Sequence, residues 1–250
     1  MRASLFVTCL IDMYQPSTGV AAVELLRAAG CEVSCPMGQT CCGQPAWNSG
    51  FADEGAKVAR TTLDALENDG AEVVVVPSGS CATMMTVFWP EMFEVVGDHK
   101  SAHRARRLGV KVRELSSFLV ERMQQGELEL APGASQTVAY HHSCHMLREL
   151  RIETPPLDLL EAAGCAVAEW PDAYRCCGFG GLFSMKLPET SVAMADEKLR
   201  SLPSDVRTIV GSDGSCLMHL RGRMESEGIP VVARHLAEVL AERLASGDAT

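Results

Sequence analysis

The 250-residue sequence has no long apolar run, no excess of positive charge and no nucleotide-binding fingerprint. A membrane helix needs about 20 consecutive apolar residues, so we expect no membrane span. The formal net charge of −10 argues against nucleic acid and anionic membranes as the main partners. Because the chain contains neither a glycine-rich dinucleotide fingerprint nor a P-loop, binding of NAD or ATP is unsupported.

The start of the chain also lacks the features of a signal peptide. Its first residues lead into a short strand-like stretch, without a long apolar region or a small-residue cleavage site. We therefore predict a cytoplasmic protein. That compartment keeps thiols reduced, so the eleven cysteines are not expected to form a disulfide framework, and their odd number would leave one unpaired. Metal or redox chemistry is the better expectation.

The cysteines themselves follow one arrangement that occurs twice. Each copy has one cysteine, then a Cys-Cys-Gly triplet after 31 intervening residues, then another cysteine after 37 more. The first set is Cys9, Cys41, Cys42 and Cys81, and the second set is Cys144, Cys176, Cys177 and Cys216. Every member of the second set lies 135 residues after its counterpart, and a fixed period indicates a duplicated unit. We predict two cysteine-rich domains, residues 1–130 and 131–250.

Predicted strands and helices alternate in the same order in both halves. The run Val73–Val76 has four β-branched residues, as in a parallel strand that is buried on both faces, and a helix over residues 51–68 precedes it. Alternation of this kind predicts an α/β fold. We expect two pseudo-symmetric repeats, each a small, mostly parallel sheet flanked by helices.

Four of the cysteines come directly after predicted strands, namely Cys9, Cys81, Cys144 and Cys216. Ligands of such sheets collect outside the carboxyl ends of the strands. The Cys-Cys-Gly loops can reach the same edge. The sequence therefore predicts that the thiols of each set converge there.

Three kinds of chemistry remain open for four convergent thiols. An iron–sulfur cluster takes four thiolates, and adjacent cysteines can reach different irons. A single zinc ion prefers Cys-x-x-Cys pairs, which neither set contains, and adjacent side chains diverge. A thiol–disulfide relay through each adjacent pair would involve a strained, reducible ring. There are thus two alternatives to a cluster protein. One is a zinc-stabilised scaffold that assembles partner subunits, and the other is a cluster-free thiol–disulfide redox protein.

Several motifs carry a resemblance to a known family. They are GQTCCGQPA at residues 38–46, NSG at 48–50, PSGSC at 77–81, CH at 144–145 and CCGFGG at 176–181. The cysteine spacing resembles the CCG domain, which occurs twice in the cysteine-rich component of heterodisulfide reductase and in iron–sulfur components of glycolate oxidase. The residues within these motifs are most similar to those of the lactate utilization protein A family, and the resemblance covers nearly the whole chain.

The resemblance implies an iron–sulfur electron-transfer subunit of an oxidoreductase complex that oxidises L-lactate to pyruvate. It implies a 4Fe–4S cluster, one or two per chain, held by the eight cysteines of the two sets. The implied partners are a ferredoxin-like iron–sulfur protein and a further subunit of the lactate utilization system. The chemistry on the substrate can then take place on a partner.

One departure from the wider domain pattern concerns a fifth cysteine in each half. Its place is taken by Ser78 in the first half and by Asp213 in the second. Five-thiolate noncubane clusters are therefore not expected. Asp213 could supply an oxygen ligand, but a carboxylate that caps a helix is the favoured interpretation.

The remaining cysteines and the histidines near Cys144 are interpreted as bystanders. Cys31, Cys35 and Cys165 lack the 135-residue correspondence, so we expect small buried apolar side chains. His141, His142 and His145 are expected to be hydrogen-bonding neighbours rather than ligands. Of these three, His145 is the best candidate for orienting a ligand or relaying a proton.

Overall fold

The computed structural model describes residues 1–245 and contains two four-stranded sheets in which every strand pairing is parallel. The first sheet has the order β2-β1-β3-β4, with β1 Arg2–Leu5, β2 Glu32–Ser34, β3 Val73–Val76 and β4 Val112–Glu114. The second has the order β6-β5-β7-β8, with β5 Gln136–His141, β6 Cys165–Val167, β7 Thr208–Gly211 and β8 Val232–His235. The strand order is the same in both, which confirms the prediction of two α/β repeats.

Helices connect the strands in both halves. The first half contains α1 Cys9–Tyr14, α2 Pro16–Ala28, α3 Gln44–Trp47, α4 Ala52–Asp69, α5 Gly79–Thr83, the π-helix η1 Met84–Phe88, α6 Trp89–Val95, α7 His99–Gly109 and α8 Leu115–Gln124. The second contains α9 Cys144–Arg148, α10 Pro155–Ala162, α11 Leu182–Lys186, α12 Pro188–Arg200, α13 Gly214–Ser226 and α14 Leu236–Ala241. The longer connection of the first half forms α6 and α7.

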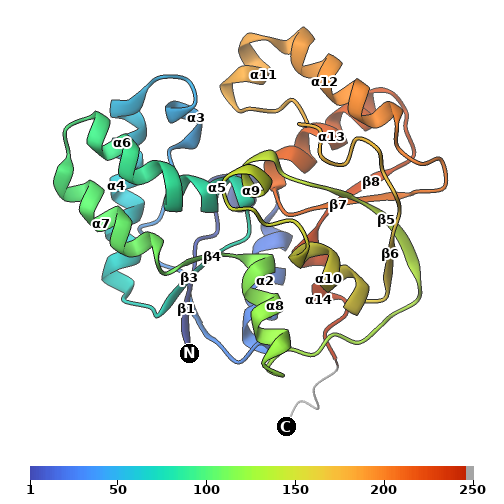
Figure 1. Ribbon diagram of the computed structural model, residues 1–250, viewed down its shortest axis with the longest axis horizontal. Helices are drawn as coiled ribbons and strands as arrows, with labels where there is room; N and C mark the ends of the chain where they lie inside the picture. The colour runs from blue at the N-terminus through green and yellow to red at the C-terminus, as the bar shows by residue number, and fades with distance from the viewer. Residues whose placement is uncertain (246–250) are drawn as a thin grey trace.

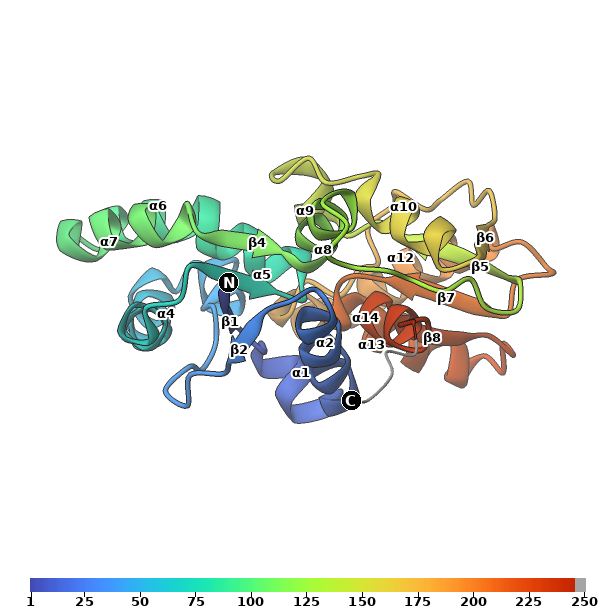
Figure 2. The same ribbon diagram turned by 90° about the horizontal axis from the view of Figure 1, so that it is seen from below.

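Four helices, two from each half, pack together at the centre of the molecule (Figure 1 and Figure 2). Helix α2 packs on α14, and α8 packs on α10, so each contact joins the two halves. Their apolar side chains form one shared core with one face of each sheet, for example Leu26 of α2, Leu119 of α8, Leu160 of α10 and Leu240 of α14. Because hydrophobic burial stabilises a fold roughly in proportion to the apolar area removed from water, this core stabilises both halves together.

The other face of each sheet has a core of its own. In β3, Val73 and Val75 belong to the shared core, whereas Val74 and Val76 pack against the outer helices of the first half. Successive side chains of a strand point to opposite faces, so β3 is buried on both faces as its run of valines predicts. Figure 1 shows α4, α6 and α7 outside the first sheet, and α12 and α13 beside the second.

Strand β6 covers Cys165–Val167 and ends before Trp170. The pairing register of β6 with β5 ends at Val167. Trp170 turns inward, and its indole Nε1–H donates to the Lys198 carbonyl oxygen and to Ser201 Oγ. The buried indole therefore removes this segment from the sheet edge.

No helix in residues 1–245 is long and apolar enough to cross a membrane. The proposed division between residues 130 and 131 stays a prediction. The chain there pairs Leu130 with Leu244 in an isolated antiparallel bridge, so the segment is tied to the end of the second half.

Candidate metal centres

The first set of thiols meets at the carboxyl ends of β1 and β3. Cys9 begins α1, Cys81 lies in α5, and the loop before α3 brings Cys41 and Cys42 to them. The Sγ atoms of Cys9 and Cys41 are 3.4 Å apart, and those of Cys42 and Cys81 are also 3.4 Å apart. The four thiols that the sequence predicts for this set are therefore brought together.

The second set occupies the equivalent elements. Cys144 begins α9 and Cys216 lies in the first turn of α13, so both follow strands of the second sheet. The thiols of Cys144 and Cys177 both contact the Cys176 thiol, and Cys177 also contacts Cys216. The second half thus repeats the arrangement of the first.

Both sets face one cavity between the two halves. The cavity has a volume of about 290 Å³, and all eight cysteines line it. The halves touch beside it, where the Gly79 amide donates to the Ser212 carbonyl oxygen over 3.2 Å. A group bound by one set would therefore lie close to a group bound by the other.

The glycine after each cysteine pair has a conformation that other residues rarely adopt. Gly43 has a φ of 81° and Gly178 a φ of 92°, both in the left-handed region. A Cβ at Gly43 would come within 2.7 Å of the Gly55 carbonyl oxygen, and one at Gly178 within 2.6 Å of the Ser191 oxygen. Each glycine amide lies 3.5 Å from the sulfur of the first cysteine of its pair and donates to it. Glycine is therefore needed at both places.

The thiols of each set perturb one another strongly. Hydrogen bonds from Cys42 and then from Cys9 lower the pKa of Cys41 to about 3. Hydrogen bonds from Cys144 and then from Cys177 lower the pKa of Cys176 to about 2. The donor thiols shift the other way, and their pKa values are raised (Cys9, Cys42, Cys144, Cys177). Each set thus favours one thiolate, and ionisation of all four thiols would require a nearby positive charge to offset their repulsion.

Asp213 has a different role from the one predicted. Within the described chain its side chain makes no capping bond to its own helix α13. Instead, Oδ2 accepts from the Ser80 amide at the start of α5 over 2.9 Å, and Oδ1 accepts from Ser215 Oγ over 2.6 Å. Ser143 Oγ and Ser78 Oγ lie 3.3 and 3.4 Å from Oδ2. The carboxylate therefore caps a helix of the other half and joins the halves beside the cavity.

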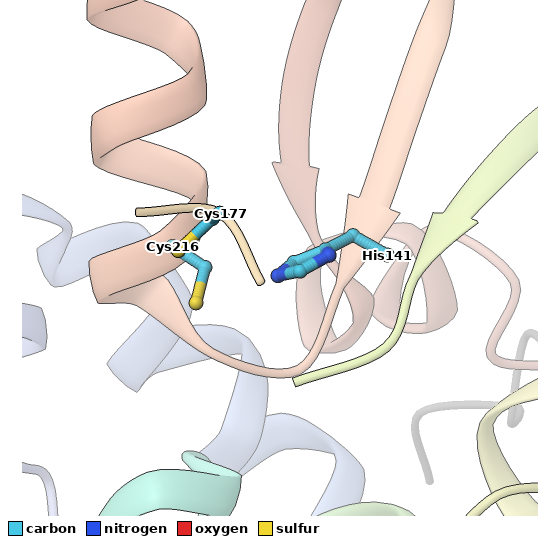
Figure 3. Close-up of side chains that lie close together, drawn as sticks. All are labelled: His141, Cys177 and Cys216. Atoms are coloured by element: carbon cyan, nitrogen blue, oxygen red, sulfur yellow. The ribbon is translucent and has the colours of Figure 1, made fainter. Parts of the chain in front are cut away.

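His141 is placed where the sequence did not predict a functional group. It ends β5, and its side chain points toward the sulfurs of Cys177 and Cys216 (Figure 3). One ring nitrogen and these two sulfurs all lie within 4.8 Å of one another. His141 is 1% exposed, and neither ring nitrogen has a hydrogen-bond partner among the residues that the structure describes. The prediction of a hydrogen-bonding neighbour is therefore wrong, and burial lowers the pKa of His141 well below its ordinary value.

The other two histidines lie farther from the thiol chemistry. The His142 ring stacks on Tyr174, with ring centroids 4.4 Å apart. His145 lines the cavity, and its Nδ1 is 3.5 Å from a Glu149 carboxylate oxygen. The role of His145 in orienting a ligand or relaying a proton stays a prediction.

The three remaining cysteines are remote from the cavity. Cys31 and Cys165 are buried in the shared core, as predicted. Cys35 is exposed, so the prediction of burial is wrong for this residue. It follows the edge strand β2 and precedes Pro36, and an edge position leaves it in solvent.

Lys198 is a further group that the sequence analysis missed. It is fully buried, and its ammonium donates to the carbonyl oxygens of Asp172, Ala173 and Arg175. These residues lead directly into Cys176, so Lys198 holds the loop that carries the second cysteine pair. Burial lowers its pKa to about 8, while Cys177 and then Cys216 act in the opposite direction. Its counterpart in the first half, 135 residues earlier, is Leu63.

The chemistry of the donor set fits a thiophilic metal. Soft thiolate ligands select iron–sulfur clusters, zinc and similar metals over hard cations. Each set offers four thiols, and the second adds an imidazole whose nitrogens are unused within residues 1–245. The cavity beside them leaves room for a group larger than a single ion.

Comparison with known proteins agrees with this geometry. The model of the CCG cysteine-rich domain matches residues 3–86 and again residues 138–221. The chain is 44% identical over 243 residues to lactate utilization protein A of an Exiguobacterium species, covering 96% of this chain and 97% of that one. It is 43% identical over 242 residues to lactate utilization protein A of Macrococcus caseolyticus, covering 96% of each chain.

Among solved structures, the chain matches a glutamate racemase from Thermus thermophilus with a TM-score of 0.32 and 13% identity. That match covers 96% of this chain and 77% of the racemase, and a score this low supports no argument. The identities above, over nearly the full length of both chains, confirm the resemblance that the motifs carry. The chain belongs to the lactate utilization protein A family and contains two copies of the cysteine-rich CCG domain.

Proposed function

We propose that this chain binds iron–sulfur clusters and transfers electrons within an oxidoreductase system. The observation that carries the proposal is that all eight cysteines of the two sets line one cavity of about 290 Å³. The ligands would be Cys9, Cys41, Cys42 and Cys81 for one cluster and Cys144, Cys176, Cys177 and Cys216 for the other. We infer clusters of the 4Fe–4S type, one or two per chain, because four thiolates are the usual complement.

The substrate of the system is inferred from the relatives. Proteins 40–44% identical to this chain are called lactate utilization protein A, and we propose oxidation of L-lactate to pyruvate as the reaction served. That reaction releases two electrons and two protons. A ferredoxin-like iron–sulfur protein and a further subunit would be the partners, and the cytoplasm would be the location.

The chain's own residues would bind such a cluster and stabilise its negative charge. The eight thiolates supply the ligands, while the Gly43 and Gly178 amides donate to two of the sulfurs and spread their negative charge. The buried ammonium of Lys198 adds a positive charge near the second set alone. A bound cluster would supply one-electron redox chemistry at this site.

The proposal is tested by mixing the anaerobically purified full-length protein with its two partner proteins and L-lactate. The visible absorption of the clusters should bleach on addition of lactate and return with an oxidant. A variant with Cys42→Ser and Cys177→Ser should show no such change. A wild-type protein that contains clusters but is never reduced under these conditions would contradict the electron-transfer role.

One observation favours a second candidate. His141, Cys177 and Cys216 bring a nitrogen and two sulfurs within 4.8 Å of one another, which is a spacing suited to a single zinc ion. A zinc-supported scaffold for the partner subunits would be colourless and would contain zinc without sulfide. Metal and sulfide analysis therefore separates the two candidates.

A further inference from the structure

One difference between the two halves lies beside the cysteines. His141 ends β5 of the second sheet, and its counterpart 135 residues earlier is Phe6. Phe6 is fully buried and packs in the same cluster as Cys42 and Cys81, the counterparts of Cys177 and Cys216. The repeat thus places an apolar ring in one half where the other half has an imidazole.

Burial of the His141 imidazole without a hydrogen-bond partner is unfavourable. His141 is 1% exposed, and neither of its ring nitrogens has a hydrogen-bond partner in residues 1–245. A buried polar group without a partner destabilises the fold, and such groups are rare in folded proteins. The ring points toward the sulfurs of Cys177 and Cys216 (Figure 3), and one ring nitrogen lies within 4.8 Å of both, so one metal ion could bind all three atoms.

Asp213 does not compete for this role. Its two carboxylate oxygens accept hydrogen bonds from the Ser80 amide and the Ser215 hydroxyl, with two more serine hydroxyls nearby. The residue that replaces the fifth cysteine is therefore occupied in joining the halves. Within residues 1–245, Nδ1 of His145 and both ring nitrogens of His141 are buried without a hydrogen-bond partner, and only His141 groups with the sulfurs of Cys177 and Cys216.

We propose that His141 is a nitrogen ligand of the metal centre in the second half, and that the first half has no equivalent ligand. The inference rests on the proposed function, since it assigns one more ligand to one of the two centres. It makes the two centres chemically different: thiolates alone in the first half, and thiolates with one imidazole in the second. The type of ligand helps to set the potential of an iron–sulfur centre, so an added imidazole would also make the two centres differ in potential.

The test is pulsed electron paramagnetic resonance of the reduced, full-length protein, prepared with ¹⁴N-histidine or ¹⁵N-histidine. The wild type should show the coupling of a directly bound imidazole nitrogen, and the coupling should change with the isotope. In His141→Phe, which copies the first half, the coupling should be lost. In the control His142→Phe, whose native ring stacks on Tyr174 beside the site, it should persist.

A wild-type spectrum without a directly bound nitrogen would overturn the proposal, and this result needs no variant to fold. A nitrogen coupling that survives in His141→Phe would overturn the proposal as well.

A second measurement separates this inference from the proposed function. The metal-free, full-length protein is loaded with Co²⁺ alone, and its ligands are counted by X-ray absorption. Sulfur and nitrogen scattering in the wild type, with the nitrogen lost in His141→Phe, supports the ligand even if no iron–sulfur cluster is ever found. Sulfur scattering alone in the wild type contradicts it, whatever the protein does with iron.

Discussion

Among the cysteines, position rather than burial separates the proposed ligands from the bystanders. Cys31 and Cys165 are 7% and 6% exposed, close to the 9% and 7% of Cys81 and Cys216. The first two lie in the shared core, whereas the last two line the cavity. A thiol in an apolar core behaves as a small apolar side chain, and a thiol beside three others can act as a ligand.

We predict that Cys42→Ser and Cys177→Ser each lower the iron content of the anaerobically purified protein, because serine is a poor substitute for thiolate on iron. The matched changes Cys31→Ser and Cys165→Ser should leave iron per chain unchanged and cost roughly 0.5–3 kcal/mol of stability. The measurement is iron per chain in the four variants, purified in parallel. Full iron in both Cys42→Ser and Cys177→Ser would show that the adjacent pairs are not essential ligands.

Lys198 carries a second prediction at this scale. In Lys198→Met the three carbonyl oxygens of the loop lose their donor, and the free energy of unfolding of the metal-free protein should fall by roughly 3–5 kcal/mol. The loop before Cys176 should loosen, so iron should also be released faster to a chelator. The exposed Lys57→Met on α4 is the control, and it should change neither property. Equal urea midpoints for the two variants would contradict the role of Lys198.

The signal that locates His141 and Lys198 is present in the sequence but needs the repeat to be seen. In the first half, the residues that correspond to them in the repeat are apolar: Phe6 for His141 and Leu63 for Lys198. A buried ionisable residue in one copy of a duplicated fold marks a local function of that copy. The hydrogen bonds of Asp213 could not have been predicted, because they join segments whose proximity depends on how the halves dock.

At the scale of elements, the equivalent strands β4 and β8 end in residues that cap the next helix. Glu114 Oε2 accepts from the Ser116 and Ser117 amides at the start of α8. His235 Nδ1 accepts from the Ala237 amide at the start of α14. Both caps are buried, and each fixes a helix of the shared core to its sheet.

The Glu114 cap predicts a pH dependence of stability. Burial raises the pKa of Glu114 from 4.5 to about 7, so the folded chain binds this proton more tightly than the unfolded chain. Its contribution is therefore fully present below about pH 4.5 and is lost as the pH rises to about 7. The loss should amount to at most roughly 3 kcal/mol.

The check is urea unfolding of the metal-free protein at several values across this pH range. Glu114→Gln should remove this part of the decline, while Glu121→Gln, an exposed change on the same helix, should retain it. A decline of the same size in Glu114→Gln and in the wild type would assign the effect to other groups.

The elements themselves could be predicted where the local signal is strong. The strand Val73–Val76 lies where the sequence places it, and α4 ends before Gly70, which has a φ of 68°. The chain after β6 is harder to predict, because Trp170 is buried by a contact with residues 198 and 201, far along the chain. Local pattern holds no information on such a contact.

At the scale of the molecule, the two halves depend on one another. Glu238 of α14 accepts hydrogen bonds from Ser17 and Thr18 of α2, over 2.7 and 3.0 Å. The shared core and these hydrogen bonds join α2 of the first half to α14 of the second half. The duplication predicts two similar units, but it does not predict that their thiols face one cavity, since this follows from the docking of the halves.

We predict that the halves unfold as one unit. Leu26→Ala removes a fully buried side chain of α2 and should cost roughly 2–5 kcal/mol. Hydrogen exchange should accelerate in β5 and β7 of the second half as much as in β1 and β3 of the first. Val20→Ala, at an exposed position of the same helix, is the control and should change neither the free energy of unfolding nor hydrogen exchange in the strands. Faster exchange confined to the first half would show two independent domains.

The central claim is that the cavity holds iron–sulfur clusters. The most direct test is the amount of iron, acid-labile sulfide and zinc per chain in the full-length protein, purified without oxygen. The account predicts a brown protein with iron and sulfide in similar amounts, near four of each per bound cluster, and little zinc. A colourless protein with stoichiometric zinc and no sulfide, or one with free thiols and no metal, would contradict it.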